Sequence, residues 1–65
     1  MESSKYRIST VYEALRILVA MSESADPLGP QEASKEAGCS VNTAFRMLET
    51  LSELDFARKT EGGYV

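Results

Sequence analysis

The chain is 65 residues long, with 43% hydrophobic and 26% charged residues, which is the composition of an ordinary globular domain. A chain of this length builds one small core and leaves no room for a catalytic cleft within a second layer. With no histidine, a single cysteine and scattered carboxylates, the sequence argues against a disulfide, a metal site and general acid–base catalysis. We therefore expect neither an enzyme nor a cofactor-binding protein.

Hydropathy and charge narrow the class of partner. No apolar run is long enough to span a membrane, and no signal-peptide pattern follows Met1, so we expect a cytoplasmic protein without a membrane partner. The formal net charge of −3 counts against nucleic-acid binding, because such binding rests largely on neutralised phosphates. The placement of charge matters more than its sum. Four of the seven basic residues lie near the two ends of the chain: Lys5, Arg7, Arg58 and Lys59.

The first helix is expected to follow an arm formed by residues 1–9 and to open a domain over residues 10–65. Thr10 and Glu13 have the spacing of a capping box, which predicts a helix from about residue 11 to about residue 24. Ile17 widens the apolar face of this helix. The residues that predict the face recur at helical spacing: Val11, Ala14, Leu15, Leu18 and Met21.

Two further helices are expected around a tight turn. Residues 26–30 contain two prolines and cannot continue a helix, but Pro30 suits the first position of a second helix over residues 31–37. Gly38 ends that helix in the left-handed conformation. Ser40 or Asn42 then caps a third helix that runs to about residue 54. Its core face has helical spacing and consists of Ala44, Met47, Leu48 and Leu51.

After Asp55 the pattern changes to two short strands over residues 56–59 and 63–65. The turn between them, residues 60–62, is expected to use its glycine for a positive φ. The turn at residues 38–40 is too short for its two helices to stack antiparallel, so they must cross at a large angle, as in a helix-turn-helix. The order of elements predicts a mainly α winged helix-turn-helix domain with a two-stranded wing.

The sequence resembles the DNA-binding domain of the IclR family of bacterial regulators over about residues 10–65. Residues 10–18 are similar to the family's opening Ala-Leu-x-Ile-Leu helix, and residues 38–51 follow its turn and recognition helix without a gap. The family's Thr-x-x-Arg-x-Leu-x-Thr-Leu motif in the recognition helix is matched by Thr43, Arg46, Leu48, Thr50 and Leu51. Its Gly-Gly-Tyr motif at the end of the wing is matched by Gly62, Gly63 and Tyr64. The resemblance implies sequence-specific duplex DNA binding in transcription regulation. It places a helix over about residues 41–54 in the major groove and the wing, residues 56–65, on the backbone.

Several positions depart from the family. Glu13 stands where the family often has an arginine, which removes one candidate phosphate contact. Asp55 replaces a glycine at the turn into the wing, and aspartate tolerates the left-handed conformation better than most residues. Ser34 replaces a small alanine. Cys39 takes a turn position that is usually apolar, so we expect a buried, inert thiol. Residues 1–65 contain no counterpart of the family's C-terminal effector-binding domain, so we expect either an excised DNA-binding domain or a natural single-domain protein.

The candidate DNA-binding residues lie on the third helix and the wing. Asn42, Thr43, Phe45, Arg46 and Glu49 fall opposite the core face of that helix. Asn42 and Thr43 could bond phosphates or base edges, and Arg46 a guanine or a phosphate. Val41 and Phe45 are helix neighbours that could meet thymine methyl groups. The full candidate set is Ser40, Val41, Asn42, Thr43, Phe45, Arg46, Arg58 and Lys59.

Plainer alternatives stay open for each of these residues. Asn42 could simply cap its helix, Arg46 could be a solvated surface arginine, and Phe45 could fold back onto the hairpin. The rival function is a protein-interaction module, such as a small phage-type or regulatory adaptor. The acidic balance, Glu13 and an exposed pair formed by Val41 and Phe45 favour it. For DNA binding a homodimer is expected, because one small module buries too little surface for tight specific binding.

Overall fold

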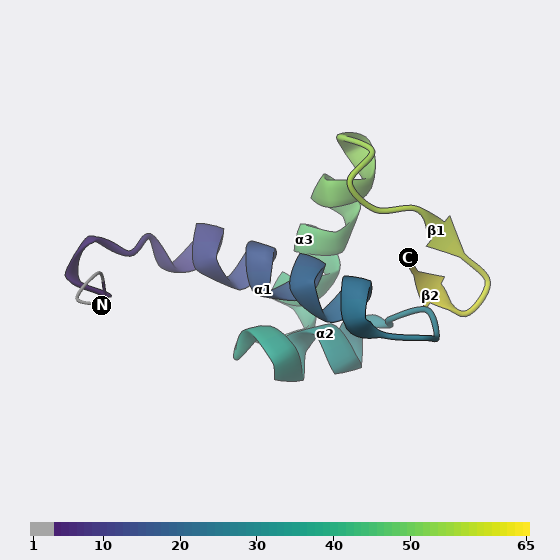
Figure 1. The fold of residues 1–65 in the computed structure, drawn as a ribbon, viewed down its shortest axis with the longest axis horizontal. Helices are drawn as coiled ribbons and strands as arrows, with labels where there is room; N and C mark the ends of the chain where they lie inside the picture. The colour runs from purple at the N-terminus through teal and green to yellow at the C-terminus, as the bar shows by residue number, and fades with distance from the viewer. Residues whose placement is uncertain (1–3) are drawn as a thin grey trace.

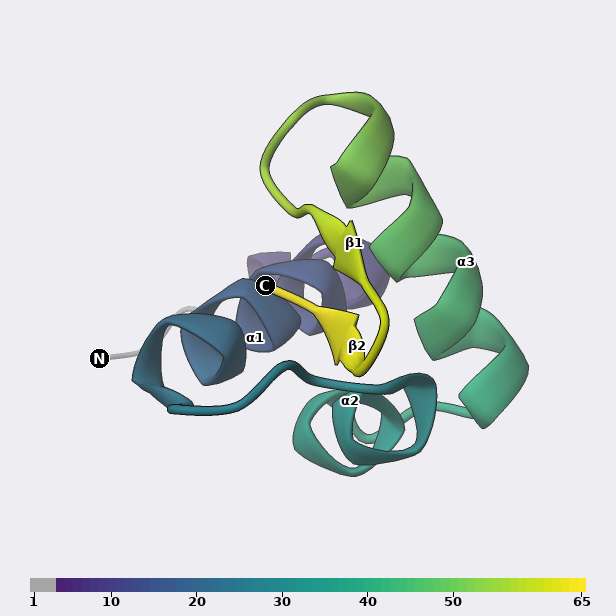
Figure 2. The same cartoon turned by 90° about the vertical axis from the view of Figure 1, so that its right-hand side faces the viewer.

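The computed structural model describes residues 4–65. A short 3-10 turn, η1 (Ser4–Tyr6), precedes three helices and a hairpin: α1 (Ser9–Glu23), α2 (Pro30–Ala37), α3 (Val41–Glu53), β1 (Lys59–Thr60) and β2 (Gly63–Tyr64). Helix α3 runs across α2 and not alongside it, and the hairpin lies on the same side of the molecule as α3 (Figures 1 and 2). This mainly helical order with a two-stranded wing confirms the predicted fold class. No helix within residues 4–65 is long and apolar enough to cross a membrane.

Helix α1 begins earlier than the sequence predicts. Ile8 is its N-cap, no side chain caps it, and the carbonyl of Ile8 accepts a hydrogen bond from the Tyr12 amide at 2.9 Å. The predicted capping box of Thr10 and Glu13 is therefore wrong. Because the helix already includes Ser9, both residues lie inside its first turns and not at its boundary.

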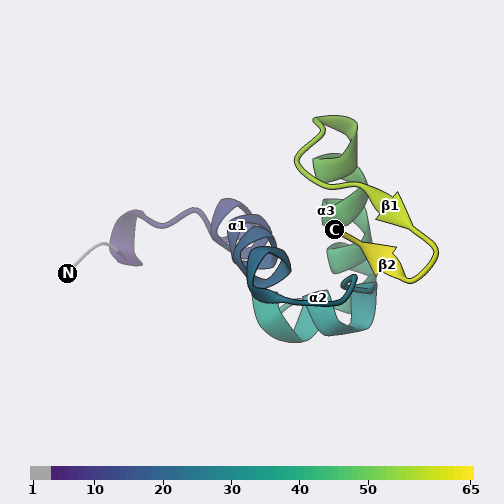
Figure 3. The same ribbon diagram turned by 45° about the vertical axis from the view of Figure 1, so that its right-hand side comes forward.

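The buried face of α1 is also turned relative to the prediction. Ile17 is fully buried, whereas Val11 and Leu15, which the sequence placed in the core face, each remain 52% exposed. Partly buried Leu18 and Met21 complete the packed side. The physical reason is that Val11 and Leu15 line an open groove between α1 and α3, with Met47 and Leu51 on its other wall, so they are covered only in part. Figure 3 shows the two helices that form this groove.

The tight turn between α2 and α3 follows the prediction closely. Pro30 occupies the first position of α2, and Gly38 ends that helix with a φ of 76°. Ser40 caps α3, because its Oγ accepts a hydrogen bond from the Thr43 amide at 3.1 Å. Asn42 is the second residue inside α3, so a capping role for Asn42 is wrong.

A small core holds the three helices and the hairpin together. On α3 the buried residues are Ala44, Leu48 and Leu51, with Met47 partly buried, as the periodicity predicts. Ser34 is buried on α2, and its hydroxyl donates to the carbonyl of Gln31 at 2.7 Å, which satisfies the polar group. The complete buried apolar cluster is Ile17, Leu28, Ala33, Ala37, Ala44, Leu48, Leu51, Ala57 and Tyr64.

The wing is a shorter hairpin than the sequence predicts. Lys59 pairs with Tyr64 and Thr60 with Gly63, and the Thr60 hydroxyl donates to the Gly63 carbonyl at 2.9 Å. Asp55 follows the end of α3 and has a φ of 66°. This value lies in the left-handed region, which aspartate tolerates better than most residues. The predicted role of Gly62 is wrong, because the positive φ of 141° belongs to Gly63.

A third segment, not predicted from the sequence, joins the wing. Leu28 forms an antiparallel bridge with Tyr64, with N–H···O=C distances of 2.8 and 2.9 Å between the two backbones. The bridge links the loop after α1 to the last strand. It requires a close approach of the two chains at Gly63, where a Cβ atom would lie 2.7 Å from the Leu28 carbonyl oxygen. Gly63 is therefore needed both for its φ and for its lack of a side chain.

Candidate nucleic-acid interface

The outward ridge of α3 carries two polar side chains in its first turns. Asn42 and Arg46 are exposed and lie four residues apart, so they are neighbours on the helix surface. They lie opposite the buried side chains of Ala44, Leu48 and Leu51. The structure thus brings together the amide and the guanidinium that the sequence selected.

Two of the predicted contact residues already have partners within the chain. The Ser40 hydroxyl lies 2.9 Å from the Thr43 hydroxyl and also caps α3. Thr43 is half-buried. These two side chains hold the first turn of the helix, which contains Asn42, and Arg46 follows one turn later.

Val41 and Phe45 form an apolar strip along α3 beside this ridge. They are 46% and 42% exposed, so the hairpin does not enclose Phe45 as the plainer alternative assumed. Their spacing of four residues makes them neighbours on the helix surface. The strip is open to thymine methyl groups or to another apolar surface.

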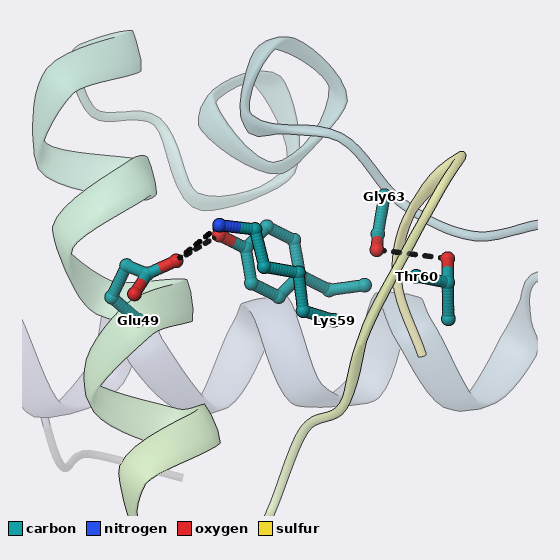
Figure 4. Close-up of polar contacts among 5 residues, drawn as sticks. Glu49, Lys59, Thr60 and Gly63 are labelled. Carbon is teal, nitrogen blue, oxygen red and sulfur yellow. Dashed lines mark hydrogen bonds and ion pairs between the residues drawn. The ribbon is translucent and has the colours of Figure 1, made fainter.

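Glu49 does not belong to the outward face, and that part of the prediction is wrong. Its carboxylate accepts a hydrogen bond from the buried Tyr64 hydroxyl and lies 3.4 Å from the Lys59 Nζ atom (Figure 4). The reason is tertiary, since the hairpin packs along this flank of α3. Sequence reasoning missed this link, because nothing in the local pattern relates residue 49 to the end of the wing.

The pKa values of Tyr64 and Glu49 are shifted so that each group keeps the charge state that favours their hydrogen bond at neutral pH. Burial, and then the neighbouring Glu49 carboxylate, raises the pKa of Tyr64 to about 12. The hydrogen bond from Tyr64, and then the Lys59 ammonium, lowers the pKa of Glu49 despite its partial desolvation. A neutral phenol therefore faces an ionised carboxylate, which fastens the wing to α3.

The link makes wing stability depend on pH in two directions. The lowered pKa of Glu49 contributes stability that is present above its unfolded-state value and is lost as pH falls through the folded value. The raised pKa of Tyr64 contributes stability that is lost as pH rises toward about 12.

We expect Tyr64→Phe to destabilise the domain at neutral pH, and to differ less in stability from the wild type at low pH and at high pH. Urea unfolding across pH, with Tyr12→Phe as the control, measures this. An equal loss from Tyr64→Phe at every pH would contradict it.

The basic residues at the two ends of the chain do not form one patch. Lys5 and Arg7 stack on neighbouring tyrosine rings, with Arg7 lying 4.1 Å from the Tyr12 ring centroid. The segment before α1, which contains both residues, lies at the opposite end of the long axis from the hairpin (Figure 1), and Arg58 and Lys59 belong to the wing. Lys59 is already paired with Glu49, so Arg58 is the wing cation with no ion pair within the described residues.

Cys39 behaves as a structural thiol in the turn. It is partly buried, which is less than predicted. Burial, and then the negative charge of Glu13, raises the pKa of its thiol, so the thiolate is disfavoured. Within residues 4–65 no group of three or more side chains could hold a metal ion.

Helices α2 and α3 are joined by a tight turn, α3 carries an outward polar ridge, and a hairpin is fastened beside it. These features define a winged helix-turn-helix domain. Residues 10–61 match the model of the IclR helix-turn-helix domain, and the chain belongs to this family. It is a DNA-binding domain that acts in transcription regulation. No curated protein and no solved structure matches the chain.

Proposed function

We propose that the domain binds duplex DNA sequence-specifically, with the N-terminal half of α3 in the major groove. The observation that carries this proposal is the exposed pair of Asn42 and Arg46 opposite the core face of α3. An arginine reads the O6 and N7 atoms of guanine, and an asparagine reads the N6 and N7 atoms of adenine. Val41 and Phe45 supply apolar contacts next to them.

The wing is proposed to contact the backbone beside the groove. Arg58 is exposed there, and the link from Glu49 to Tyr64 holds the hairpin at a defined place beside α3. Phosphate contacts position a domain on DNA, whereas base contacts specify the sequence. The wing would thus set the orientation in which Asn42 and Arg46 meet the bases.

Amide chemical-shift mapping with a duplex tests the proposed face directly. Changes should centre on residues 41–49 and 58–63 as DNA is added, because these segments carry the ridge and the wing. A response confined to α1, or no response at high duplex concentration, would refute the proposal.

Salt dependence gives a second test, with a numerical expectation. Each neutralised phosphate contributes about −0.9 to the slope of log affinity against log salt, so a monomer with few contacts should show about −2 to −4. Replacing Arg58 and Lys59 together by alanine should reduce the magnitude of the slope by about 1 without unfolding the domain, since Lys59 is partly neutralised by Glu49. Lys35→Ala, on α2, serves as the control and should leave the slope unchanged.

A protein-interaction module is the second candidate function. The exposed strip of Val41 and Phe45 and the net charge of −3 favour it. In that case Phe45→Ala abolishes binding to the partner, while the double replacement of Arg58 and Lys59 has no effect. This alternative would be favoured if the affinity for duplex DNA did not depend on salt concentration and if Phe45→Ala weakened partner binding more than any other replacement.

Dimerisation forms part of the proposed DNA binding. One small module buries about 600–1,000 Å² on DNA, which is the low end for specific recognition. Two domains on one site would double the contacts and make affinity depend on the spacing of the half-sites.

A further inference from the structure

The wing carries one free cation and one paired cation. Arg58 is exposed and forms no ion pair within residues 4–65. Lys59, the next residue, places its Nζ atom 3.4 Å from the Oε2 atom of Glu49 on the neighbouring helix α3 (Figure 4). The side chains of Lys59 and Glu49 are 66% and 43% exposed, so the pair lies at the surface of the domain and within reach of a ligand.

The carboxylate of Glu49 is held in place before Lys59 reaches it. Exposed ion pairs are usually weak, partly because two flexible side chains must be kept in one geometry. Here the Oε2 atom that faces Lys59 also accepts a hydrogen bond from the hydroxyl of Tyr64, a buried side chain. Only the lysine side chain therefore loses freedom when the pair forms, which makes this pair more persistent than an isolated surface pair.

An internal ion pair of this kind opposes the main source of affinity for DNA. Binding to a duplex of any sequence depends on basic side chains that neutralise phosphates and release counterions. A lysine paired with a carboxylate neutralises a phosphate only if it leaves its partner, and the carboxylate itself repels the phosphate. Residues 56–65 contain two basic residues, so the pair withholds half of the positive charge of the wing.

We propose that Glu49 restrains the affinity of the domain for DNA by holding Lys59 away from the phosphate backbone. Glu49 is a positioning residue, since it acts through Lys59 and not by contact with a base. The restraint lowers affinity for every duplex by the same factor, so it leaves the base preference of Asn42 and Arg46 unchanged. A single domain then binds any duplex weakly, and tight binding needs the base contacts and a second copy. The inference rests on the proposed function and describes its regulation.

Glu49→Gln tests the restraint through a gain of binding. Glutamine keeps an oxygen that can accept the hydrogen bond from Tyr64, so the wing stays attached, but it removes the charge that holds Lys59. For a duplex of random sequence, affinity at 0.1 M salt should rise about 3-fold to 10-fold, and the salt slope should steepen by up to about 0.9, the value of one phosphate. Glu49 acting only as a structural link predicts a loss of affinity, so an unchanged or lower affinity overturns the proposal.

Two further variants show whether the gain acts through Lys59. Glu53→Gln removes the same charge one turn later on α3, and Glu53 is exposed and forms no ion pair within residues 4–65, so the salt slope should stay unchanged. Lys59→Ala should alter affinity little in the wild type but should abolish the gain in the Glu49→Gln background, because only there is the lysine free. An equal effect of Lys59→Ala in both backgrounds overturns the proposal.

Titration with a heparin oligosaccharide at low salt separates this inference from the proposed function. Heparin is a polyanion without base pairs, so it detects a free lysine whether or not the domain reads DNA. Glu49→Gln should bind heparin more tightly than both the wild type and Glu53→Gln. If that ranking holds while no variant binds duplex DNA, the proposed function fails and the withholding of Lys59 stands. Equal heparin affinity of Glu49→Gln and Glu53→Gln overturns the inference, whatever the duplex assay shows.

Discussion

Leu48→Ala is expected to cost about 2–5 kcal/mol of unfolding free energy, the loss typical of truncating a buried leucine. Leu48 is fully buried on the core face of α3 and belongs to the apolar cluster that also includes Leu28 and Tyr64. A domain of this size has a total stability of roughly 3–10 kcal/mol at the usual value per residue. The variant should therefore be partly unfolded at 37 °C, as thermal unfolding followed by circular dichroism will measure.

Arg46→Ala is the matched variant on the opposite face of the same helix. Arg46 is exposed, so its loss should change stability little, while affinity for a cognate duplex should fall by about 10-fold to 100-fold if it reads a base. Binding isotherms and thermal unfolding of both variants separate the two roles. A larger loss of stability from Arg46→Ala than from Leu48→Ala would contradict the assignment of the two faces.

Gly63→Ala is expected to detach the wing. The φ of 141° at Gly63 is in a region that other residues rarely occupy, and backbone strain of this kind costs on the order of 1–3 kcal/mol. The added Cβ would also lie 2.7 and 2.8 Å from the carbonyl oxygen and carbon of Leu28, which are backbone atoms and cannot rotate away. We expect the bridge between Leu28 and Tyr64 to open. Hydrogen exchange at these two amides should then become much faster.

Gly62→Ala provides the control one residue earlier. A Cβ at Gly62 meets only the Pro27 ring, at ordinary contact distances of 3.5 and 3.7 Å, and the residue has no positive φ. Its replacement should leave the Leu28 and Tyr64 amides protected. The opposite ranking of the two variants would restore the sequence-based assignment of Gly62 as the special glycine of the turn.

Local signals in the sequence determined much of the fold. Pro30 at the start of α2, Gly38 at its end and Ser40 before α3 act through their own backbone conformation or through hydrogen bonds to the next turn. The core stripe around Leu48 follows from helical periodicity alone, and it leaves Arg46 on the outward ridge. These features need only neighbouring residues, so the sequence was sufficient to predict them.

The tertiary structure decided the features that depend on contacts between distant residues. Glu49 is directed toward the wing because its carboxylate accepts a hydrogen bond from the Tyr64 hydroxyl. Gly63 is required because the Leu28 backbone lies too close to it for a Cβ atom. The face that α1 buries is set by how α2 and α3 pack against it, and so Leu15, apolar and correctly spaced, lines an open groove beside α3 and remains 52% exposed. Periodicity shows that a helix has an apolar face. Only the packing partners determine which of two such faces is buried, because burial depends on the whole chain.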